Sequence, residues 1–240
     1  MKKFFCYLSF LFLLLSLNLS AQQVLGNLTS YSHSKNALSL VAGNAGLQIV
    51  FIAPDILKIT LLPTLSTKPD SSFAVINNEL GSVQISVVDS PTVLKVFGGE
   101  LSLTINKKPL QISLSAFGED LLPPTPSISQ FAWNGAARTM QFALPPSVNY
   151  YGAGARGTAL RLNQLSFESF NTQVGGYHLP QSTMNLNIPF ITTDFQVGIF
   201  ADNTYPLTFD VGKSTPNVFK CTASGGELSV YLFAGNQQRQ

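Results

Sequence analysis

The stretch LSLTINKKPLQISL, residues 101–114, decides the fold class. Apolar and polar residues alternate before and after Asn106 to Pro109, a segment with the composition of a hairpin loop. Because successive side chains of a strand point to opposite faces, the apolar side chains of both strands face one core. We therefore predict a β-hairpin whose core-facing residues are Leu101, Leu103, Ile105, Leu110, Ile112 and Leu114.

Short alternating segments of the same kind recur on both sides of this hairpin. They include LQIVF (47–51), ILKITLL (56–62), SVQISVV (82–88), TMQFAL (139–144) and ELSVYLF (227–233). No window of a dozen residues carries an apolar helical stripe free of Gly and Pro. We predict an all-β fold with little helix, a large antiparallel β-sandwich. The stretch EDLLPPTPSISQ (119–130) is either the boundary between two halves of the sandwich or a long loop.

The N-terminus has the three parts of a secretory signal peptide. Two lysines precede an apolar run from Phe4 to Leu19, and a small residue, Ala21, follows. The alternative is an uncleaved anchor, but this run is shorter than the ~20 apolar residues that a spanning helix needs. We predict that residues 1–21 are a cleaved signal peptide. The mature chain, 22–240, is then a single β-sandwich domain, secreted or periplasmic, with no membrane span.

Charged residues are sparse in this chain. They make up 11% of it, against about 25% in an average soluble protein. Without residues 1–21 the chain has 12 basic and 12 acidic residues, and the basic ones form no cluster. No nucleic-acid partner is expected, because such a partner needs a basic face. A surface rich in Ser, Thr, Asn and Gln is compatible with neutral ligands such as sugars.

Residues that carry metal, redox or nucleophilic chemistry are few. After cleavage Cys221 is the single cysteine, so no internal disulfide is expected, and in NVFKCTAS it has the setting of a core residue. His33 and His178 stand alone, and no second group of His, Cys or carboxylates gives metal-ligand spacing. We predict no cofactor, no metal and no cysteine nucleophile, since such a thiol needs a histidine partner.

The stretch GAGARG, residues 152–157, matches G-x-G-x-x-G, the spacing of a dinucleotide-binding loop. Such a loop needs a helix after it and an acidic residue about 20 positions on. The sequence that follows predicts no helix, and Glu168 comes too early and Asp194 too late. We predict a tight β-corner instead, because glycine accepts positive φ and lets two backbone segments approach closely.

Four short motifs follow one another in a distinctive order. They are YGAG (151–154), NT (171–172), NIPF (187–190) and DNTYPLTFD (202–210). This set resembles the N-terminal domain of glycoside hydrolase family 31, the α-glucosidase and α-xylosidase group. The resemblance covers roughly residues 40–235. It implies a galactose-mutarotase-like β-sandwich packed beside a catalytic (β/α)8 barrel.

In that family the barrel cleaves α-glycosidic bonds with retention, using one Asp as nucleophile and another as acid/base. The resemblance therefore implies an oligo- or polysaccharide with α-glycosidic linkages as ligand. It also implies a catalytic barrel encoded elsewhere, and no turnover by this chain alone. We assign no catalytic residue within the chain. Glu119 and Asp120 are expected in a solvated turn, Asp202 in a turn at a strand end, and Asp210 outward or toward a neighbouring domain.

Two positions depart from the family pattern. Ala155 stands where the family carries a glutamate, and Gln173 stands where it carries an aspartate that hydrogen-bonds sugar hydroxyls in the active site. The amide of Gln173 can still donate and accept hydrogen bonds. The resemblance thus implies a substrate-binding loop made of Asn171, Thr172, Gln173 and Tyr177. Further candidates for ligand contact, expected to be mostly loop or core residues, are His178, Tyr150, Tyr151 and Trp133.

Two alternatives to a glycosidase domain stay open. A free-standing carbohydrate-binding module would bind glycans with no enzyme attached. A structural or interaction β-sandwich would bind no glycan, and an exposed apolar face would make it prone to associate.

Overall fold

The hairpin predicted at 101–114 is present. The protein is seen in a computed structural model that describes residues 21–67, 72–76, 83–123, 127–143, 145–173, 175–176 and 186–235. Strands β8 (Leu101–Lys107) and β9 (Leu110–Ala116) pair antiparallel, with Leu103 opposite Leu114 and Ile105 opposite Ile112. All six apolar residues predicted to face the core are at most 3% exposed.

The described residues form 19 strands in three antiparallel sheets and contain no helix. The largest sheet has eight strands in the order β13-β15-β16-β19-β5-β4-β3-β2. In chain order these are β2 (Ser30–His33), β3 (Ala37–Ala42), β4 (Ala45–Ala53), β5 (Ile56–Leu62), β13 (Tyr150–Gly152), β15 (Phe190–Thr193), β16 (Val197–Asp202) and β19 (Leu228–Ala234).

The two smaller sheets have six and five strands. The six-stranded sheet has the order β1-β11-β12-β18-β17-β14 and the five-stranded sheet the order β10-β9-β8-β7-β6. The former contains β1 (Gln23–Val24), β11 (Phe131–Asn134), β12 (Ala137–Ala143), β14 (Ser166–Ser169), β17 (Leu207–Val211) and β18 (Val218–Ala223). The latter contains β6 (Ser86–Asp89), β7 (Val93–Gly98), β8, β9 and β10 (Glu119–Leu122).

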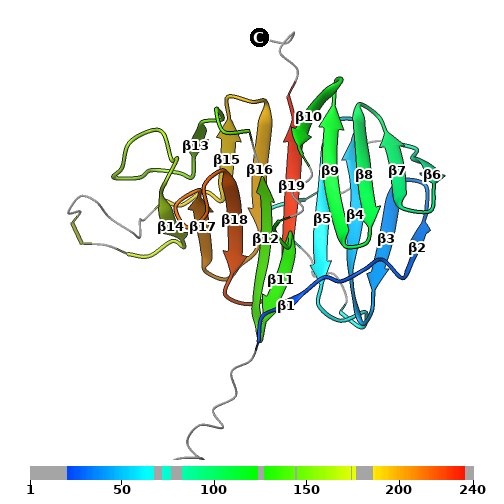
Figure 1. Ribbon diagram of the computed structural model, residues 1–240. Helices are drawn as coiled ribbons and strands as arrows, with labels where there is room; N and C mark the ends of the chain where they lie inside the picture. The colour runs from blue at the N-terminus through cyan, green and yellow to red at the C-terminus, as the bar shows by residue number, and fades with distance from the viewer. Residues whose placement is uncertain are drawn as a thin grey trace, which may run out of the picture.

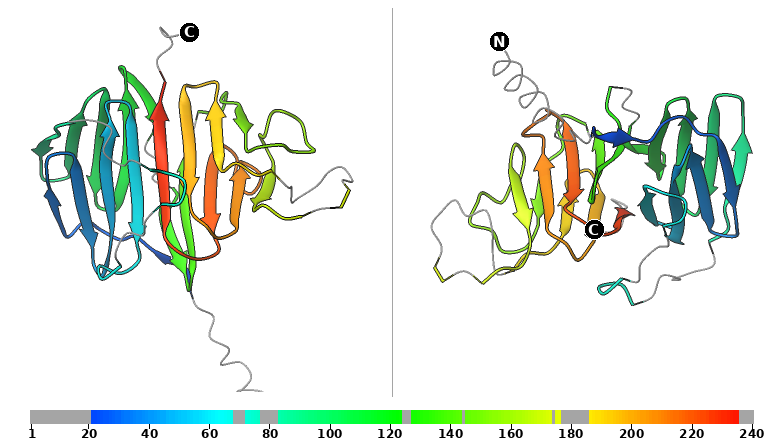
Figure 2. Two further views of the ribbon diagram at one scale, coloured as in Figure 1. Left: turned by 180° about the vertical axis from the view of Figure 1, so that it is seen from behind. Right: turned by 90° about the horizontal axis from the view of Figure 1, so that it is seen from below.

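Together the two smaller sheets cover one face of the eight-stranded sheet. In Figure 1 the six-stranded sheet lies in front of β15 and β16, and the five-stranded sheet lies in front of β5, β4 and β3; Figure 2 shows the two layers from below. The core lies between these layers, where the ring of Tyr150 in β13 stacks on Phe219 in β18 at 6.0 Å between centroids. The prediction of a large antiparallel β-sandwich is therefore confirmed.

The segment 119–130 joins the two smaller sheets. It begins as β10, an edge strand on β9, and the chain then enters β11 of the six-stranded sheet. Gln130, which is 2% exposed, bridges the sheets with its side chain. Its Nε2 donates to Ile112 O at 2.7 Å and its Oε1 accepts from Ile112 N at 2.7 Å. The amide thus takes the place of a peptide group between two sheets that have no strand pair in common.

Residues 23–29 form an N-terminal strap that contacts all three sheets. After β1 pairs with β11, Leu25 N donates to Phe131 O at 3.1 Å in the six-stranded sheet. Leu28 N donates to Lys107 O at 2.8 Å in the five-stranded sheet, and Thr29 N donates to Val41 O at 2.8 Å in the eight-stranded sheet. The strap therefore crosses the end of the sandwich and ties its layers together.

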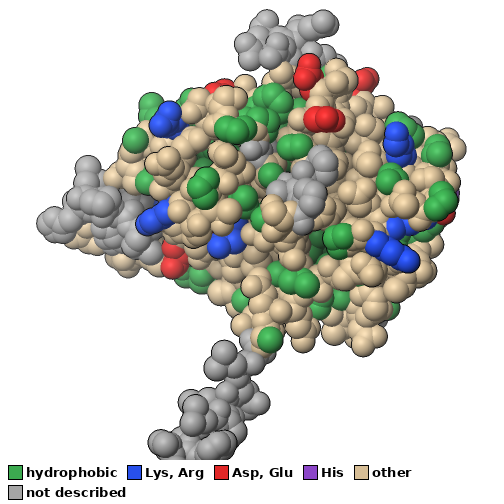
Figure 3. Space-filling model, in the orientation of Figure 1, with side chains coloured by type: hydrophobic (Ala, Val, Ile, Leu, Met, Phe, Trp, Pro, Cys, Tyr) green, Lys and Arg blue, Asp and Glu red, His purple; other side chains and the backbone are tan. Residues whose placement is uncertain are grey.

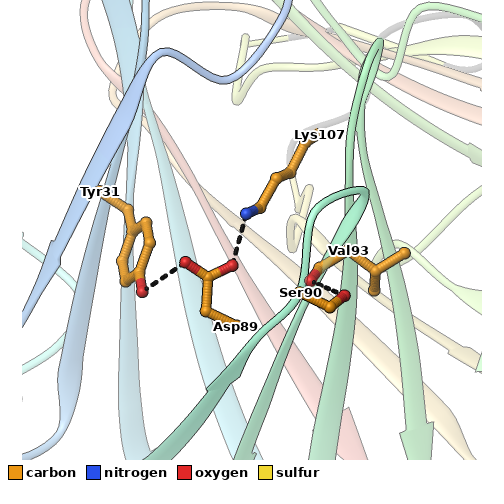
Figure 4. A network of polar contacts seen from close by, with 5 residues as sticks. All are labelled: Tyr31, Asp89, Ser90, Val93 and Lys107. Carbon is orange, nitrogen blue, oxygen red and sulfur yellow. Dashed lines mark hydrogen bonds and ion pairs between the residues drawn. The ribbon is translucent and has the colours of Figure 1, made fainter.

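A polar network joins the outer edges of two sheets. Asp89 at the end of β6 accepts a hydrogen bond from Tyr31 Oη of β2 at 3.1 Å. It also forms an ion pair with Lys107 of β8 (Figure 4). The hydrogen bond from Lys107 holds the pKa of the Asp89 carboxyl below its usual value, and the same carboxylate raises the pKa of Tyr31. Because Asp89 is exposed at the surface and Tyr31 and Lys107 are only half-buried, this network contributes little to stability.

The surface is as poor in charge as the composition predicts. On the face seen in Figure 3, basic and acidic side chains are few and scattered. None of the described residues belongs to a helix of the length and hydropathy that crossing a membrane requires. Cys221 is fully buried in β18 as a free thiol, the core position that the sequence predicts. Burial raises the pKa of this thiol.

Candidate functional site

The GAGARG stretch forms a β-corner, as predicted. Gly152, Ala153 and Gly154 all have positive φ, at 103°, 64° and 84°. The corner lies against the segment Leu186 to Phe190: Ala153 N donates to Phe190 O at 2.9 Å and Ala155 N donates to Leu186 O at 3.0 Å. A Cβ on Gly154 would lie 2.4 Å from Leu186 O, so only glycine permits this approach.

Arg156 leaves the corner toward the interior. Its Nη2 donates to Glu168 O at 3.0 Å and to Asn187 Oδ1 at 2.8 Å, and its guanidinium carbon lies 3.8 Å from the centre of the Phe167 ring. Burial lowers the pKa of Arg156 to about 10, so the side chain stays charged at neutral pH. Its Nε and Nη1 are enclosed and have no hydrogen-bond partner in the described part of the chain. This cation joins the corner to β14 and to the NIPF motif.

Asn187 connects the NIPF motif to the predicted sugar-binding loop. It is 6% exposed, and its backbone N donates to Asn171 Oδ1 at 2.6 Å. Its Nδ2 donates to Phe170 O at 2.7 Å and, more weakly, to Asn171 Oδ1 at 3.3 Å. The motifs at 151–154, 171–172 and 187–190 are therefore one contiguous structure, with the Asn171 side chain fixed at its surface.

A cleft of about 200 Å³ opens beside Asn171. It runs between the end of β14, the NIPF motif and the turn after β16, so the fourth motif, DNTY, completes it. We call it the asparagine cleft, and its lining residues are Ser169, Phe170, Asn171, Asn187, Pro189, Asn203, Thr204, Tyr205 and Leu207. Two exposed aromatic side chains flank the amides, Phe170 at 39% and Tyr205 at 52% exposure.

Tyr205 has the setting of a stacking platform. A Cβ on Gly225 or Gly226 would lie 2.8 or 2.9 Å from the ring, so the two glycines let the ring lie against the backbone. Asn203 fixes the turn beneath it: Nδ2 donates to Gly225 O at 3.0 Å and to Glu227 O, and Oδ1 accepts from Tyr205 N at 2.6 Å. An aromatic ring held in this way can stack on the apolar face of a sugar.

The predicted loop residues lie in different settings. Asn171 lines the asparagine cleft, Thr172 is half-buried with a hydroxyl that has no partner in the described residues, and Gln173 is exposed. Tyr177 and the further candidate His178 lie outside the described residues. Tyr205 and Phe170, which also line this cleft, were not predicted as candidate ligand contacts, although Tyr205 belongs to the DNTY motif. The glycine pair that receives the Tyr205 ring lies some twenty residues further on.

Three other aromatic candidates are mainly structural. Tyr150 is 5% exposed and stacks in the core, while Tyr151 and Trp133 are half-buried. Trp133 packs against the hydrophobic core from β11.

The acidic residues do not form a catalytic pair at this site. The outward position predicted for Asp210 is wrong: it is 4% exposed and caps the turn that follows β17. Its Oδ1 accepts from Lys213 N at 2.9 Å and its Oδ2 from Ser214 Oγ at 2.5 Å, so the turn folds back over the carboxylate. Asp202 ends β16, and Asn203 supplies the hydrogen bonds of the following turn. Among the described residues no group of three His, Cys, Asp or Glu could hold a metal.

The family model that matches this chain is the glycosyl hydrolase 31 N-terminal galactose mutarotase-like domain, over residues 46–210. The chain belongs to this family. That range contains all four motifs and the walls of the asparagine cleft. The resemblance stated from the sequence is thereby confirmed, and the corner, the amide cluster and the DNTY turn are features of a glycoside hydrolase 31 N-terminal domain.

Related proteins agree with this assignment. Alpha-glucosidase 2 of Bacillus thermoamyloliquefaciens is 25% identical over 216 residues, 88% of this chain and 27% of that protein. A glycoside hydrolase 31 dextranase of Flavobacterium johnsoniae, solved with isomaltotriose, has the same fold at a TM-score of 0.83 and 24% identity; the match covers 89% of this chain and 27% of that one. A cycloalternan-forming enzyme of Listeria monocytogenes, solved with a pentasaccharide substrate, matches at 0.79 and 16% identity, over 91% and 21%. The chain thus spans about a quarter of the length of these relatives.

Proposed function

We propose that this chain is the N-terminal β-sandwich domain of a secreted or periplasmic α-glycosidase. In this role it supports a catalytic (β/α)8 barrel that hydrolyses O-glycosyl bonds, and it contributes the loop 171–177 to the binding of an α-linked oligo- or polysaccharide. Residues 1–21 direct export and are then removed, which leaves a single domain at 22–240.

The observation that carries this proposal is the fixed position of Asn171. A loop that contributes to a sugar site must hold its polar groups in place before the ligand arrives. Here the buried Asn187 accepts from Arg156 and donates to Asn171, so the corner, the interior cation and the loop hold one another. Gln173 lies two residues further on and is exposed, free to reach a ligand bound by a neighbouring domain.

An apolar patch beside the cleft supports contact with another domain. Leu186, Ile188 and Phe190 alternate with the buried Asn187 and are 54%, 47% and 36% exposed. Phe170, 39% exposed, lines the cleft itself. Such a group of exposed apolar side chains at one place is typical of an interface. A barrel that packs there would bring its own residues next to Asn171.

No acidic residue is among those that line the asparagine cleft. Retaining glycoside hydrolysis needs two carboxyl groups about 5 Å apart on either side of the scissile bond. Asp210 is occupied by its turn, and Asp194 accepts from Asn149 N at 2.8 Å and Asn149 Nδ2 at 2.6 Å. Neither lines the asparagine cleft. The geometry therefore favours a binding and supporting role.

Two measurements test the proposal. The purified chain is assayed on aryl α-glucosides and α-xylosides, and we expect no turnover; turnover that persists through purification would contradict it. The chain is then joined to a catalytic barrel encoded downstream of codon 240, and Gln173→Ala is compared with the matched exposed variant Gln84→Ala, which lies in neither cleft. We expect Gln173→Ala alone to lower kcat/KM. Mass spectrometry of the exported protein checks for cleavage after residue 21.

A free-standing carbohydrate-binding module is the second candidate, and the exposed ring of Tyr205 favours it. This function requires measurable calorimetric binding of α-glucan oligosaccharides by the chain itself. Binding lost in Tyr205→Ala, with no downstream barrel in the gene, would favour the module over the enzyme domain.

A further inference from the structure

A second cleft, of about 400 Å³, lies elsewhere on the sandwich. Its walls come from residues 145–150, which lead into β13, from 161–164 before β14, and from 211–218 between β17 and β18. We call it the proline-rimmed cleft, because Pro145, Pro146 and Pro216 lie on its wall. It shares no lining residue with the asparagine cleft. Its volume falls within the ~300–1,000 Å³ usual for ligand pockets.

Tyr150 lines this cleft with an unpartnered hydroxyl. The residue is 5% exposed and its ring stacks on Phe219, yet its Oη makes no hydrogen bond within the described part of the chain. Among the described residues the enclosed side-chain atoms without a partner belong to Arg156 and Thr172, so the Tyr150 hydroxyl is open to the cleft. Asn163 fixes the backbone here, since its Oδ1 accepts from Tyr150 N at 3.1 Å and its Nδ2 donates to Val148 O at 2.8 Å. The hydroxyl is therefore held in place and available to a ligand.

Two amide residues on the cleft wall have strained backbones. Gln164 and Asn217 have φ of 62° and 59°, in the left-handed region that few non-glycine residues adopt. Both are exposed, and neither side chain has a hydrogen-bond partner in the described residues. Strain of this kind persists where the surrounding structure imposes it, and it gathers at ligand-binding positions.

The charge of the cleft favours a neutral ligand. Arg161 is the single charged residue among those that line it, and its Nη1 already donates to Asn149 Oδ1 over 3.4 Å. A lone exposed cation binds an anion weakly, whereas amides and a hydroxyl both donate and accept, as the hydroxyls of a sugar require. We propose that the proline-rimmed cleft is a binding site for a neutral oligosaccharide, with Tyr150, Gln164 and Asn217 as its hydrogen-bonding residues.

The experiment is a nuclear magnetic resonance titration of the ¹⁵N-labelled full chain. The probes are maltotriose as neutral glycan and sodium phosphate as anion, each to millimolar concentration. The readout is the side-chain amide signals of Gln164 and Asn217. Tyr150→Phe removes only the hydroxyl and leaves the ring in the core, so the variant keeps its fold. Tyr151→Phe is the matched control, because this half-buried neighbour does not line the cleft.

We expect maltotriose to shift both amide signals. Loss of one hydrogen bond raises Kd by about three- to tenfold in Tyr150→Phe, while Tyr151→Phe stays near wild type. The proposal is overturned if maltotriose shifts neither amide, if phosphate alone shifts them, or if Tyr150→Phe leaves Kd unchanged. Shifts confined to the Asn171 and Tyr205 signals would support the asparagine cleft and overturn the second site, so the two ideas fail separately.

Discussion

Replacing Gln130 by Ala should markedly lower the free energy of unfolding of the sandwich. The Ala variant removes both hydrogen bonds to Ile112, each 2.7 Å long, at a position only 2% exposed. Each buried backbone group left without a partner costs about 1–3 kcal/mol, and the freed side chain recovers up to ~2 kcal/mol of conformational entropy. The expected net loss in the free energy of unfolding is about 2–3 kcal/mol, equivalent to roughly 4–12 °C in Tm for a domain of this size.

Urea unfolding followed by circular dichroism measures this loss. The matched control is Gln141→Ala, which removes one hydrogen bond, from Nε2 to Ser129 O at 2.6 Å, at a half-buried site. It should cost no more than about 1 kcal/mol. A loss below about 0.5 kcal/mol for Gln130→Ala would refute the view that this amide joins two sheets.

The variant Gln130→Glu should make the stability of the sandwich depend on pH. A protonated carboxyl can still donate to Ile112 O and accept from Ile112 N, whereas a carboxylate would face the carbonyl oxygen at 2.7 Å. The folded-state pKa of the introduced group should therefore lie above its unfolded value of about 4.3. Its contribution to stability is then complete below the unfolded pKa and is lost as the pH rises through the folded pKa. A variant whose stability relative to wild type does not fall between acidic and neutral pH would contradict this.

Three further predictions concern single side chains. Arg156→Ala removes the donor to Asn187 Oδ1 and the contact with Phe167, and should lower the free energy of unfolding by about 1–3 kcal/mol; unchanged urea unfolding would count against it. Asp210→Ala leaves the turn after β17 without its cap, and should cost about 2–3 kcal/mol by the same assay, with Asp210→Asn in between. Lys107→Ala removes the main cause of the low pKa of Asp89. A carboxyl titration by nuclear magnetic resonance should therefore show that pKa rising toward its ordinary value, with little change in stability near neutral pH; an unmoved pKa would disprove the assignment.

The strands were predictable because their signal is local. Alternation of apolar and polar residues at 101–114 fixed both the pairing and the buried face of β8 and β9, and the absence of a helical stripe fixed the fold class. The GAGARG corner could be separated from a phosphate loop on the same grounds, since the sequence after it predicts no helix.

The positions that were wrong or missed depend on contacts distant in sequence or on a turn. Alternation along β17 placed Asp210 opposite to the core, but the turn at 213–214 folds over it and buries it. The Tyr205 ring lies against Gly225 and Gly226, some twenty residues further on. No local pattern around Tyr205 predicts this contact. The bridge from Gln130 to Ile112 likewise spans two sheets, and no periodic pattern contains it.

The position of β19 has a consequence for how the protein is made. This strand, the last along the described chain, lies between β16 and β5 in the middle of the eight-stranded sheet (Figure 1), where Thr60 and Ser229 share a buried hydrogen bond across 169 positions. Until Leu228–Ala234 has left the ribosome, β5 and β16 each present an unpaired edge. The sandwich therefore cannot form progressively during synthesis from its N-terminal half, and a nascent chain stopped before residue 228 should be a substrate for chaperones or for aggregation.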